Sequence, residues 1–175
     1  DVQRDIVKQL GLLPEQVQLF HEGIDRPNLR LDVDEVWDID DKLQHILAEV
    51  RPEMLGTGSG IVYFTLIRTL MEFSERLENE GVRHVVYHGD LPRQRRRTIQ
   101  DRFMTGDEPV VLATNAFGMG IDIVDIRLVL HADLTGSMES YYHEIRRAGR
   151  DRQPSRCLLL YEQGDRSDEH TSELH

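Results

Sequence analysis

The stretch Val-Val-Leu-Ala-Thr-Asn-Ala-Phe-Gly-Met-Gly-Ile-Asp, residues 110–122, decides the fold of this chain. Its first four residues are apolar, which is typical of a strand buried on both faces in a parallel sheet. Thr114 follows this run directly, and Gly118 and Gly120 open the turn beyond it. In open α/β folds, ligands bind to loops that follow the carboxyl ends of the strands. We therefore expect residues 113–122 to form a ligand-binding loop at the edge of a parallel sheet.

A second stretch, residues 141–151, reads Tyr-Tyr-His-Glu-Ile-Arg-Arg-Ala-Gly-Arg-Asp. It begins with the pattern of a helix and ends with arginines on both sides of a glycine, namely Arg146, Arg147 and Arg150. The planar guanidinium group presents a rigid fork of N–H donors that matches the oxygens of a phosphate group. Taken alone, such a run could simply be a solvated turn whose arginines pair with acids such as Asp151 and Glu144. Its position downstream of residues 113–122 favours the phosphate-binding interpretation.

Strands and helices alternate along the chain, as apolar spacing indicates. Expected strands cover residues 29–33, 61–64, 82–87, 110–113, 128–131 and 156–161, and expected helices cover 42–50, 66–80, 93–104 and a segment from Ser137. Gly81 should end the second of these helices, and Asp90 with Pro92 should start the third. The alternation predicts an α/β fold in which a mainly parallel sheet is covered by helices on both faces.

The overall charge excludes a protein that binds nucleic acid by bulk electrostatics, because 21 Lys and Arg face 32 Asp and Glu, for a net charge of -11. Arginines nevertheless cluster in residues 93–102 and 146–156, and such local basic surfaces can hold phosphate because distant charges are screened. The single cysteine, Cys157, excludes an internal disulfide and, without partner cysteines, a zinc site. No apolar run is long enough to span a membrane, so we expect a cytoplasmic protein with no metal site and no membrane partner.

Residues 113–122 and 141–151 resemble motifs V and VI of the superfamily 2 helicases, in the order in which that family carries them. Phe-Gly-Met-Gly-Ile-Asp followed by Arg-Ala-Gly-Arg-Asp resembles the RecQ-like DNA helicases in particular. The resemblance covers residues 1–163 and implies the second of two RecA-like lobes, a three-layer α/β/α domain. It also implies an ATP-dependent 3′ to 5′ DNA helicase, an ATP hydrolase that serves DNA repair and recombination.

The resemblance also divides the chain. Residues 1–25 are expected to be the end of a first RecA-like lobe and its linker, and residues 26–163 the second lobe. Asp25-Arg26-Pro27-Asn28-Leu29 marks the crossing between the lobes. Residues 164–175 have no apolar periodicity and resemble the translation of a sequencing adapter, so we expect a disordered, non-native tail. The chain is then a fragment at both ends.

A helicase motor needs a glycine-rich phosphate loop with a lysine and an acid that holds magnesium. Only Lys8 and Lys42 are present and neither follows a glycine, so the chain has no Walker A motif. The segments Asp34-Glu35-Val36-Trp37 and Asp168-Glu169-His170-Thr171 do not fit a Walker B box, because one lies in an alternating strand and the other in the tail. We therefore expect ATP and Mg²⁺ to be bound mainly by the missing first lobe, and the fragment alone to be inactive.

By the same resemblance, Arg147 and Arg150 are the motif VI arginines that reach the transferring phosphoryl group, and Arg150 is the expected arginine finger. Asp122 corresponds to the acid that links this lobe to the nucleotide's sugar or to the arginine finger. Gly120 lies beside it in the implied nucleotide-binding loop. The alternative role for Asp122 is to cap the loop Ile123–Ile126.

Contacts with single-stranded or duplex DNA should come from strand-end loops whose backbone N–H groups meet phosphates. Thr114 is the best candidate, with Asn115 beside it, and His88 and Gly89 form a second loop of this kind. His88 could equally be a capped surface histidine. Because phosphate contacts carry little sequence information, binding should depend on salt and not on sequence.

Two alternatives stay open. Motif VI usually has glycine at the position of Arg146 and often glutamine at that of His143, which leaves room for a non-catalytic domain that binds nucleic acid or docks a partner. The segment His88-Gly89-Asp90, together with His143, also suits a DEAD-box-like RNA helicase lobe.

Overall fold

A computed structural model describes residues 26–118, 122–123 and 125–162 of the protein. The expected first-lobe segment 1–25, Gly120 and the expected tail 164–175 lie outside the described residues. The elements in chain order are β1 (Leu29–Val36), α3 (Ile39–Glu49), α4 (Pro52–Leu55), β2 (Ser59–Tyr63), α5 (Ile67–Asn79), β3 (Val85–Tyr87), α6 (Arg93–Met104), β4 (Val110–Ala113), β5 (Ile126–His131), α7 (Met138–Ile145) and β6 (Ser155–Glu162).

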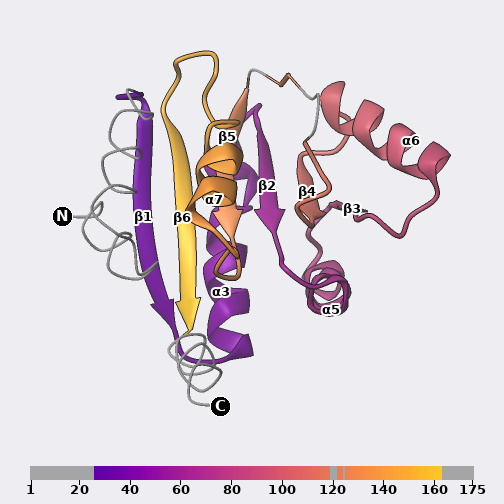
Figure 1. Ribbon diagram of the computed structural model, residues 1–175, viewed down its shortest axis with the longest axis horizontal. Helices are drawn as coiled ribbons and strands as arrows, with labels where there is room; N and C mark the ends of the chain where they lie inside the picture. Colours follow the sequence, from indigo (N-terminus) through magenta and orange to yellow (C-terminus); the bar gives the residue numbers. More distant parts are fainter. Residues whose placement is uncertain (1–25, 119–121, 124, 163–175) are drawn as a thin grey trace.

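The strands form one six-stranded sheet in the order β1-β6-β5-β2-β4-β3 (Figure 1). Every pairing between them is parallel. The central strands β2 and β4 are buried at every residue, as expected for strands covered on both faces. The predicted α/β fold with a parallel sheet is confirmed.

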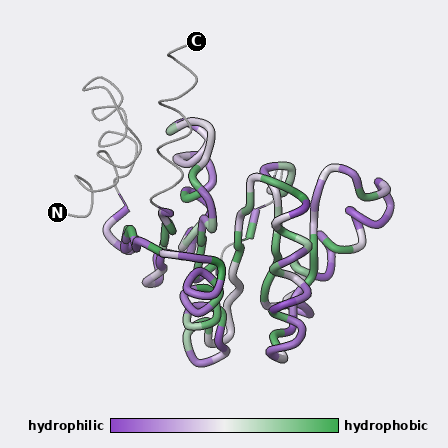
Figure 2. The backbone as a smooth tube through the Cα atoms, turned by 90° about the horizontal axis from the view of Figure 1, so that it is seen from below, coloured by the Kyte–Doolittle hydropathy of each residue, from purple (hydrophilic) through white to green (hydrophobic). Residues whose placement is uncertain are grey.

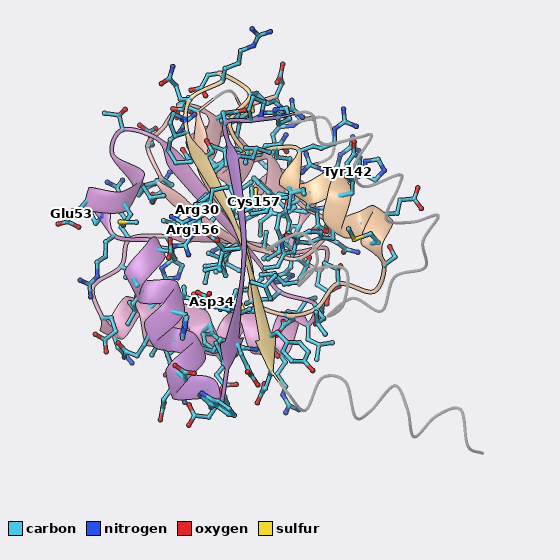
Figure 3. All side chains as sticks on the ribbon, turned by 90° about the vertical axis from the view of Figure 1, so that its left-hand side faces the viewer. Arg30, Asp34, Glu53, Tyr142, Arg156 and Cys157 are labelled. Carbon is cyan, nitrogen blue, oxygen red and sulfur yellow. The ribbon has the colours of Figure 1, made fainter. Side chains whose placement is uncertain are left out.

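Two apolar cores lie on opposite faces of the sheet. One contains residues of α6 and α7, among them Phe103 and Tyr141, and the other contains residues of α3, α4 and α5, among them Ile46 and Phe73. Figure 2 shows the helices as tubes in which apolar and polar stretches alternate. In Figure 3, where β1 faces the viewer, Arg156 lies on the α3 side of the sheet and Tyr142 on the opposite side, on α7. The predicted three-layer α/β/α arrangement is confirmed.

Local signals explain where most helices begin and end. Asp38 accepts a hydrogen bond from the Asp41 amide at 2.8 Å and so starts α3, and Ser137 starts α7 through the Ser140 amide at 3.1 Å. Gly81 takes a φ of 78° just beyond α5, as expected for the residue that ends a helix. The expected role of Asp90 was wrong, because Pro92 occupies the cap position of α6 and no side chain caps that helix.

Two further expectations needed correction. The strand expected from residue 82 begins only at Val85, because the Val82 amide donates to Leu77 O at 2.9 Å and still belongs to the end of α5. The helix α4, which begins with Pro52, was not predicted, because four residues are too few to show a helical period. No helix in the described ranges has the length and apolar character needed to cross a membrane.

Candidate functional site

The four predicted nucleic-acid residues gather at the carboxyl edge of the sheet. In the strand register, Tyr63 pairs with Ala113 and Ala113 with Tyr87, so the residues that follow β2, β4 and β3 emerge side by side. The Thr114 amide donates to Tyr87 O at 3.2 Å. A Cβ placed on Gly89 would lie 4.0 Å from the Cβ of Ala116, so the loops after β3 and β4 are in contact.

These four residues differ in their exposure to solvent. Asn115 and Gly89 are exposed, whereas Thr114 and His88 are 7% and 9% exposed. His88 Nδ1 accepts a hydrogen bond from the Asp90 amide at 3.2 Å, so its ring caps its own loop. Most of the accessible surface among the four therefore belongs to Asn115 and Gly89.

A cavity of about 370 Å³ adjoins this edge between β2, β5 and the start of α7. The residues that line it include the polar Thr65, Asn115, Asp133, Thr135 and Ser140. The Lys42 ammonium lies 3.0 Å from Asp133 Oδ1, and that carboxylate also accepts a hydrogen bond from the Thr65 amide at 3.2 Å. The cavity floor is thus held in place by an ion pair that joins α3 to the loop after β5.

The segment after β4 begins at this edge, with Thr114 and Asn115, and then leaves it. Because β4 and β5 are parallel, the chain must pass from the carboxyl end of β4 to the amino end of β5 before β5 begins at Ile126. Phe117 is buried along this path, with its ring centroid 5.0 Å from that of Tyr87 and 5.5 Å from that of Phe103. The segment therefore connects the two ends of the sheet.

The arginine-rich turn lies at the opposite, amino end of the sheet, because α7 runs back from the carboxyl edge. The Gly149 amide donates to Ile126 O, at the first residue of β5, at 2.9 Å. Asp122 accepts a hydrogen bond from Arg150 Nη1 at 2.5 Å, which joins the two sequence stretches that resemble motifs V and VI. The Arg150–Asp122 pair and the four predicted nucleic-acid residues thus occupy two separate places on the domain.

Arg147 is turned inward, whereas Arg150 is at the surface. The Arg147 guanidinium donates to Gly118 O, and its Nε is buried without a partner. Burial raises the pKa of the Tyr63 hydroxyl well above its usual value, and Tyr63 donates to Phe117 O at 3.4 Å. Arg147 therefore fixes the backbone of residues 117–118.

The Arg150–Asp122 pair is accessible, with side chains that are 35% and 78% exposed. Exposed ion pairs contribute about 0–1 kcal/mol, so another anion can displace Asp122 at little cost. The acids that were considered as alternative partners of these arginines are engaged elsewhere. Asp151 is paired with Arg127 at 2.5 Å, and this hydrogen bond lowers the pKa of its carboxyl group.

Sequence reasoning missed a buried polar pair beneath α7. His131 Nε2 lies 2.6 Å from Glu144 Oε2, and His131 and Glu144 are 1% and 7% exposed. The His131 ring also stacks on Tyr63, with 5.2 Å between ring centroids. No sequence signal pointed to this pair, because the two residues lie on different elements and only Glu144 belongs to a quoted stretch.

Sequence reasoning also missed the contacts of Arg26 and Asn28 with the arginine-rich turn. Arg26 Nη2 donates to Ala148 O at 2.6 Å, and Asn28 Nδ2 donates to Gly149 O at 2.8 Å. More than 100 residues separate the partners, although the Arg26-Pro27-Asn28 segment itself was recognised as a boundary.

The described ranges contain no group of three or more His, Cys, Asp or Glu residues that could hold a metal ion. Cys157 is buried, and burial raises the pKa of its thiol to about 12. Its sulfur makes a weak contact of 3.8 Å with Ile145 O. This thiol packs the core between β6 and α7.

Comparison with known proteins places these features in a family. Residues 39–152 match the model of the helicase conserved C-terminal domain. The chain is 39% identical over 165 residues to the ATP-dependent DNA helicase RecQ of Bacillus subtilis (strain 168), which covers 94% of this chain and 27% of that protein. It is 35% identical over 163 residues to the RecQ helicase of Haemophilus influenzae, covering 93% of this chain and 25% of that protein. The chain thus spans about a quarter of the length of these curated relatives.

Among solved structures, S. cerevisiae Dbp5 bound to RNA and ADP BeF3 superposes with a TM-score of 0.69 at 21% identity, covering 92% of this chain and 46% of that chain. This likeness shows that the two proteins share the RecA-like fold. The matched domain model, with the sequence identity to RecQ helicases, establishes that the chain belongs to the helicase conserved C-terminal domain family and is RecQ-like.

Proposed function

We propose that this chain is the second motor lobe of an ATP-dependent DNA helicase that moves 3′ to 5′. Its membership of the helicase C-terminal domain family and its sequence identity to RecQ helicases support this function. ATP and Mg²⁺ would be held mainly by a first lobe, because the chain has no Walker A motif. The second lobe would contribute an arginine to the nucleotide and a grip on the DNA backbone.

The observation that carries the nucleotide role is the exposed Arg150–Asp122 pair. Closure of two lobes would bring a triphosphate against Arg150, whose guanidinium can leave Asp122 because the pair is solvent-accessible. An arginine finger stabilises the charge that spreads over the phosphoryl oxygens, an effect of about 10³–10⁵ in rate. Asp122 would hold Arg150 in place until the nucleotide arrives.

Arg147 and Gly120 remain proposed nucleotide contacts. A contact between Arg147 and a phosphate would require its guanidinium to leave Gly118 O or to use a donor that this bond does not occupy. We therefore assign Arg150 the main role.

The DNA grip is proposed at the carboxyl edge, where Thr114, Asn115, His88 and Gly89 lie together. Backbone N–H groups and the Asn115 amide would contact phosphates, so binding should weaken steeply with salt and differ little between sequences. The connecting segment with Phe117 runs from this edge towards Asp122, which gives a physical route by which strand movement and nucleotide state are linked.

The test uses the protein joined to a first lobe that carries a Walker A motif. Arg150→Ala should lower the DNA-stimulated kcat by about 10³-fold or more while ATP binding persists. Arg152→Ala, which removes an exposed arginine from the same turn, is the matched control and should change kcat less than threefold. A kcat for Arg150→Ala near that of the unsubstituted protein would remove Arg150 from this role.

Measurements on the same two-lobe protein distinguish the helicase from the non-catalytic domain and from the RNA helicase. Arg146, which replaces the usual glycine, is exposed and lies over the Tyr142 ring at 5.3 Å, so it has a partner on its own helix. ATP turnover in the two-lobe protein would exclude the non-catalytic domain. Stronger stimulation of turnover by single-stranded RNA than by single-stranded DNA would favour the RNA helicase alternative.

A further inference from the structure

The arginine-rich turn follows helix α7 and has backbone carbonyls of its own that need partners. The helix ends at Ile145, and the amides of Arg147 and Ala148 then bond three residues back, to Glu144 O and Ile145 O. The last carbonyls of a helix have no partner within it. Arg26 binds carbonyls just beyond the helix, donating from Nη1 to Arg146 O at 3.2 Å and from Nη2 to Ala148 O at 2.6 Å. Its positive charge also suits the negative end of the helix dipole.

Asn28 closes the turn that carries Arg150. Its Nδ2 donates to Gly149 O at 2.8 Å and to Gln153 O at 3.0 Å, so one side-chain amide bridges both ends of the segment that contains Arg150. The backbone of Asn28 is bound as well, because its carbonyl accepts a hydrogen bond from the Ser155 amide at 3.0 Å, where β6 begins. Asn28 therefore holds the turn from the side of β1.

The turn needs such support because its backbone is unusual at two positions. Gly149 has a φ of 57° and Arg152 a φ of 66°, a left-handed conformation that a residue with a side chain rarely adopts. A Cβ at Gly149 would lie 2.5 Å from Asn28 Nδ2 and 2.7 Å from Ser155 Oγ, so the fit against Asn28 is close. Asn28 and Arg26, with Pro27, Arg150 and Arg152, line a single pocket of about 460 Å³.

We infer that Arg26 and Asn28 are positioning residues for Arg150, which they present to the nucleotide by holding the carbonyls on both sides of it. The inference rests on the proposed function of Arg150. Since Arg26-Pro27-Asn28 immediately precedes β1, the segment expected to link the two lobes is itself part of the support of the arginine turn. A change in the path of that segment would then alter the position of Arg150 directly.

The test again uses the protein joined to its first lobe. Asn28→Ala removes both amide donors, and Gln153→Ala is the matched control, because it removes an exposed amide from the same turn and leaves the Gln153 carbonyl in place. Asn28→Ala should lower kcat about tenfold with the KM for ATP changed less than twofold, and Gln153→Ala should do neither. If Asn28→Ala does not fold, Arg26→Lys, which keeps the charge but loses the fork, serves in its place.

Two readouts separate positioning from general structural damage. In the Arg150→Ala background, Asn28→Ala should cause no further loss of kcat, because residues that act as one unit are not additive. Hydrogen exchange of the peptide covering residues 146–155 should rise about tenfold or more, with no change in residues 93–104 of α6. Additive losses of kcat, or unchanged exchange in the turn, would overturn the inference. Faster exchange combined with a normal kcat for Arg150→Ala would instead overturn the proposed role of Arg150 while leaving the support of the turn intact.

Discussion

Replacing Gly118 with alanine tests the contact between the segment after β4 and the arginine-rich turn. Gly118 has a φ of 106°, in a region that L side chains rarely adopt. An added Cβ would lie 2.6 Å from Arg147 Nε and 2.7 Å from Arg147 Nη1. The guanidinium would have to move away and give up its hydrogen bond to Gly118 O.

The expected cost has two parts. Placing a non-glycine residue at such a φ costs about 1–3 kcal/mol. Losing a hydrogen bond that involves a charged group costs roughly 1.5–3 kcal/mol. We therefore expect Gly118→Ala to lower the free energy of unfolding by about 3–5 kcal/mol, which is a large fraction of the stability of a domain of this size.

Urea unfolding of the chain, followed by circular dichroism, measures this cost against two other glycines. Gly56 has a φ of 59° but no heavy atom within 4 Å of an added Cβ, so Gly56→Ala isolates the backbone cost, about 1–3 kcal/mol. Gly136 has neither a positive φ nor a neighbour within 4 Å, so Gly136→Ala should be neutral or slightly stabilising. In an Arg147→Ala background, the cost of Gly118→Ala should fall to roughly that of Gly56→Ala.

The reasoning is refuted if Gly118→Ala costs no more than Gly56→Ala in the otherwise unsubstituted chain. It is also refuted if the cost of Gly118→Ala is the same with and without Arg147. Either result would mean that the guanidinium does not hold the backbone at Gly118.

Two further predictions concern buried groups. Burial raises the pKa of Cys157 from 9.0 to about 12 and also raises the pKa of Tyr63. The folded state therefore keeps protons that the unfolded state loses at high pH. The resulting contribution to the free energy of unfolding is complete below pH 9 and is lost as pH rises towards 12. In urea unfolding, the free energy of unfolding should fall by roughly 2–3 kcal/mol between pH 9 and pH 11 because of the thiol alone. The same fall in a Cys157→Ala chain would show that the thiol is not its cause. His131→Ala leaves the Glu144 carboxylate buried without its partner and should destabilise the chain by about 3–5 kcal/mol in the same assay, whereas the exposed His143→Ala should cost about 0.5 kcal/mol or less. Equal losses of unfolding free energy for the two histidine variants would show that the buried His131–Glu144 pair adds nothing to stability.

Elements with a strong local signal were predicted well. The basic helix was expected over residues 93–104 and the central strand over 110–113, and the structure has α6 at Arg93–Met104 and β4 at Val110–Ala113. The parallel sheet followed from the alternation of strands and helices, because a parallel connection needs a crossover that usually contains a helix. The family resemblance rested on two stretches of consecutive residues, and it was confirmed. Such motifs can be recognised from the sequence because all their residues are neighbours in the chain.

The arrangement of the site depended on contacts that no local pattern contains. The sequence by itself determined which residue types are present, that Thr114 follows a buried strand, and that a glycine lies among the arginines of the turn. Only the tertiary structure decided that Arg147 faces Gly118 while Arg150 faces Asp122, and that Asn28 holds the turn from the start of the neighbouring strand β1. The physical reason is that a guanidinium bonds to whichever acceptor the packed backbone places within its reach, and here each of those acceptors lies 28 or more residues away along the chain.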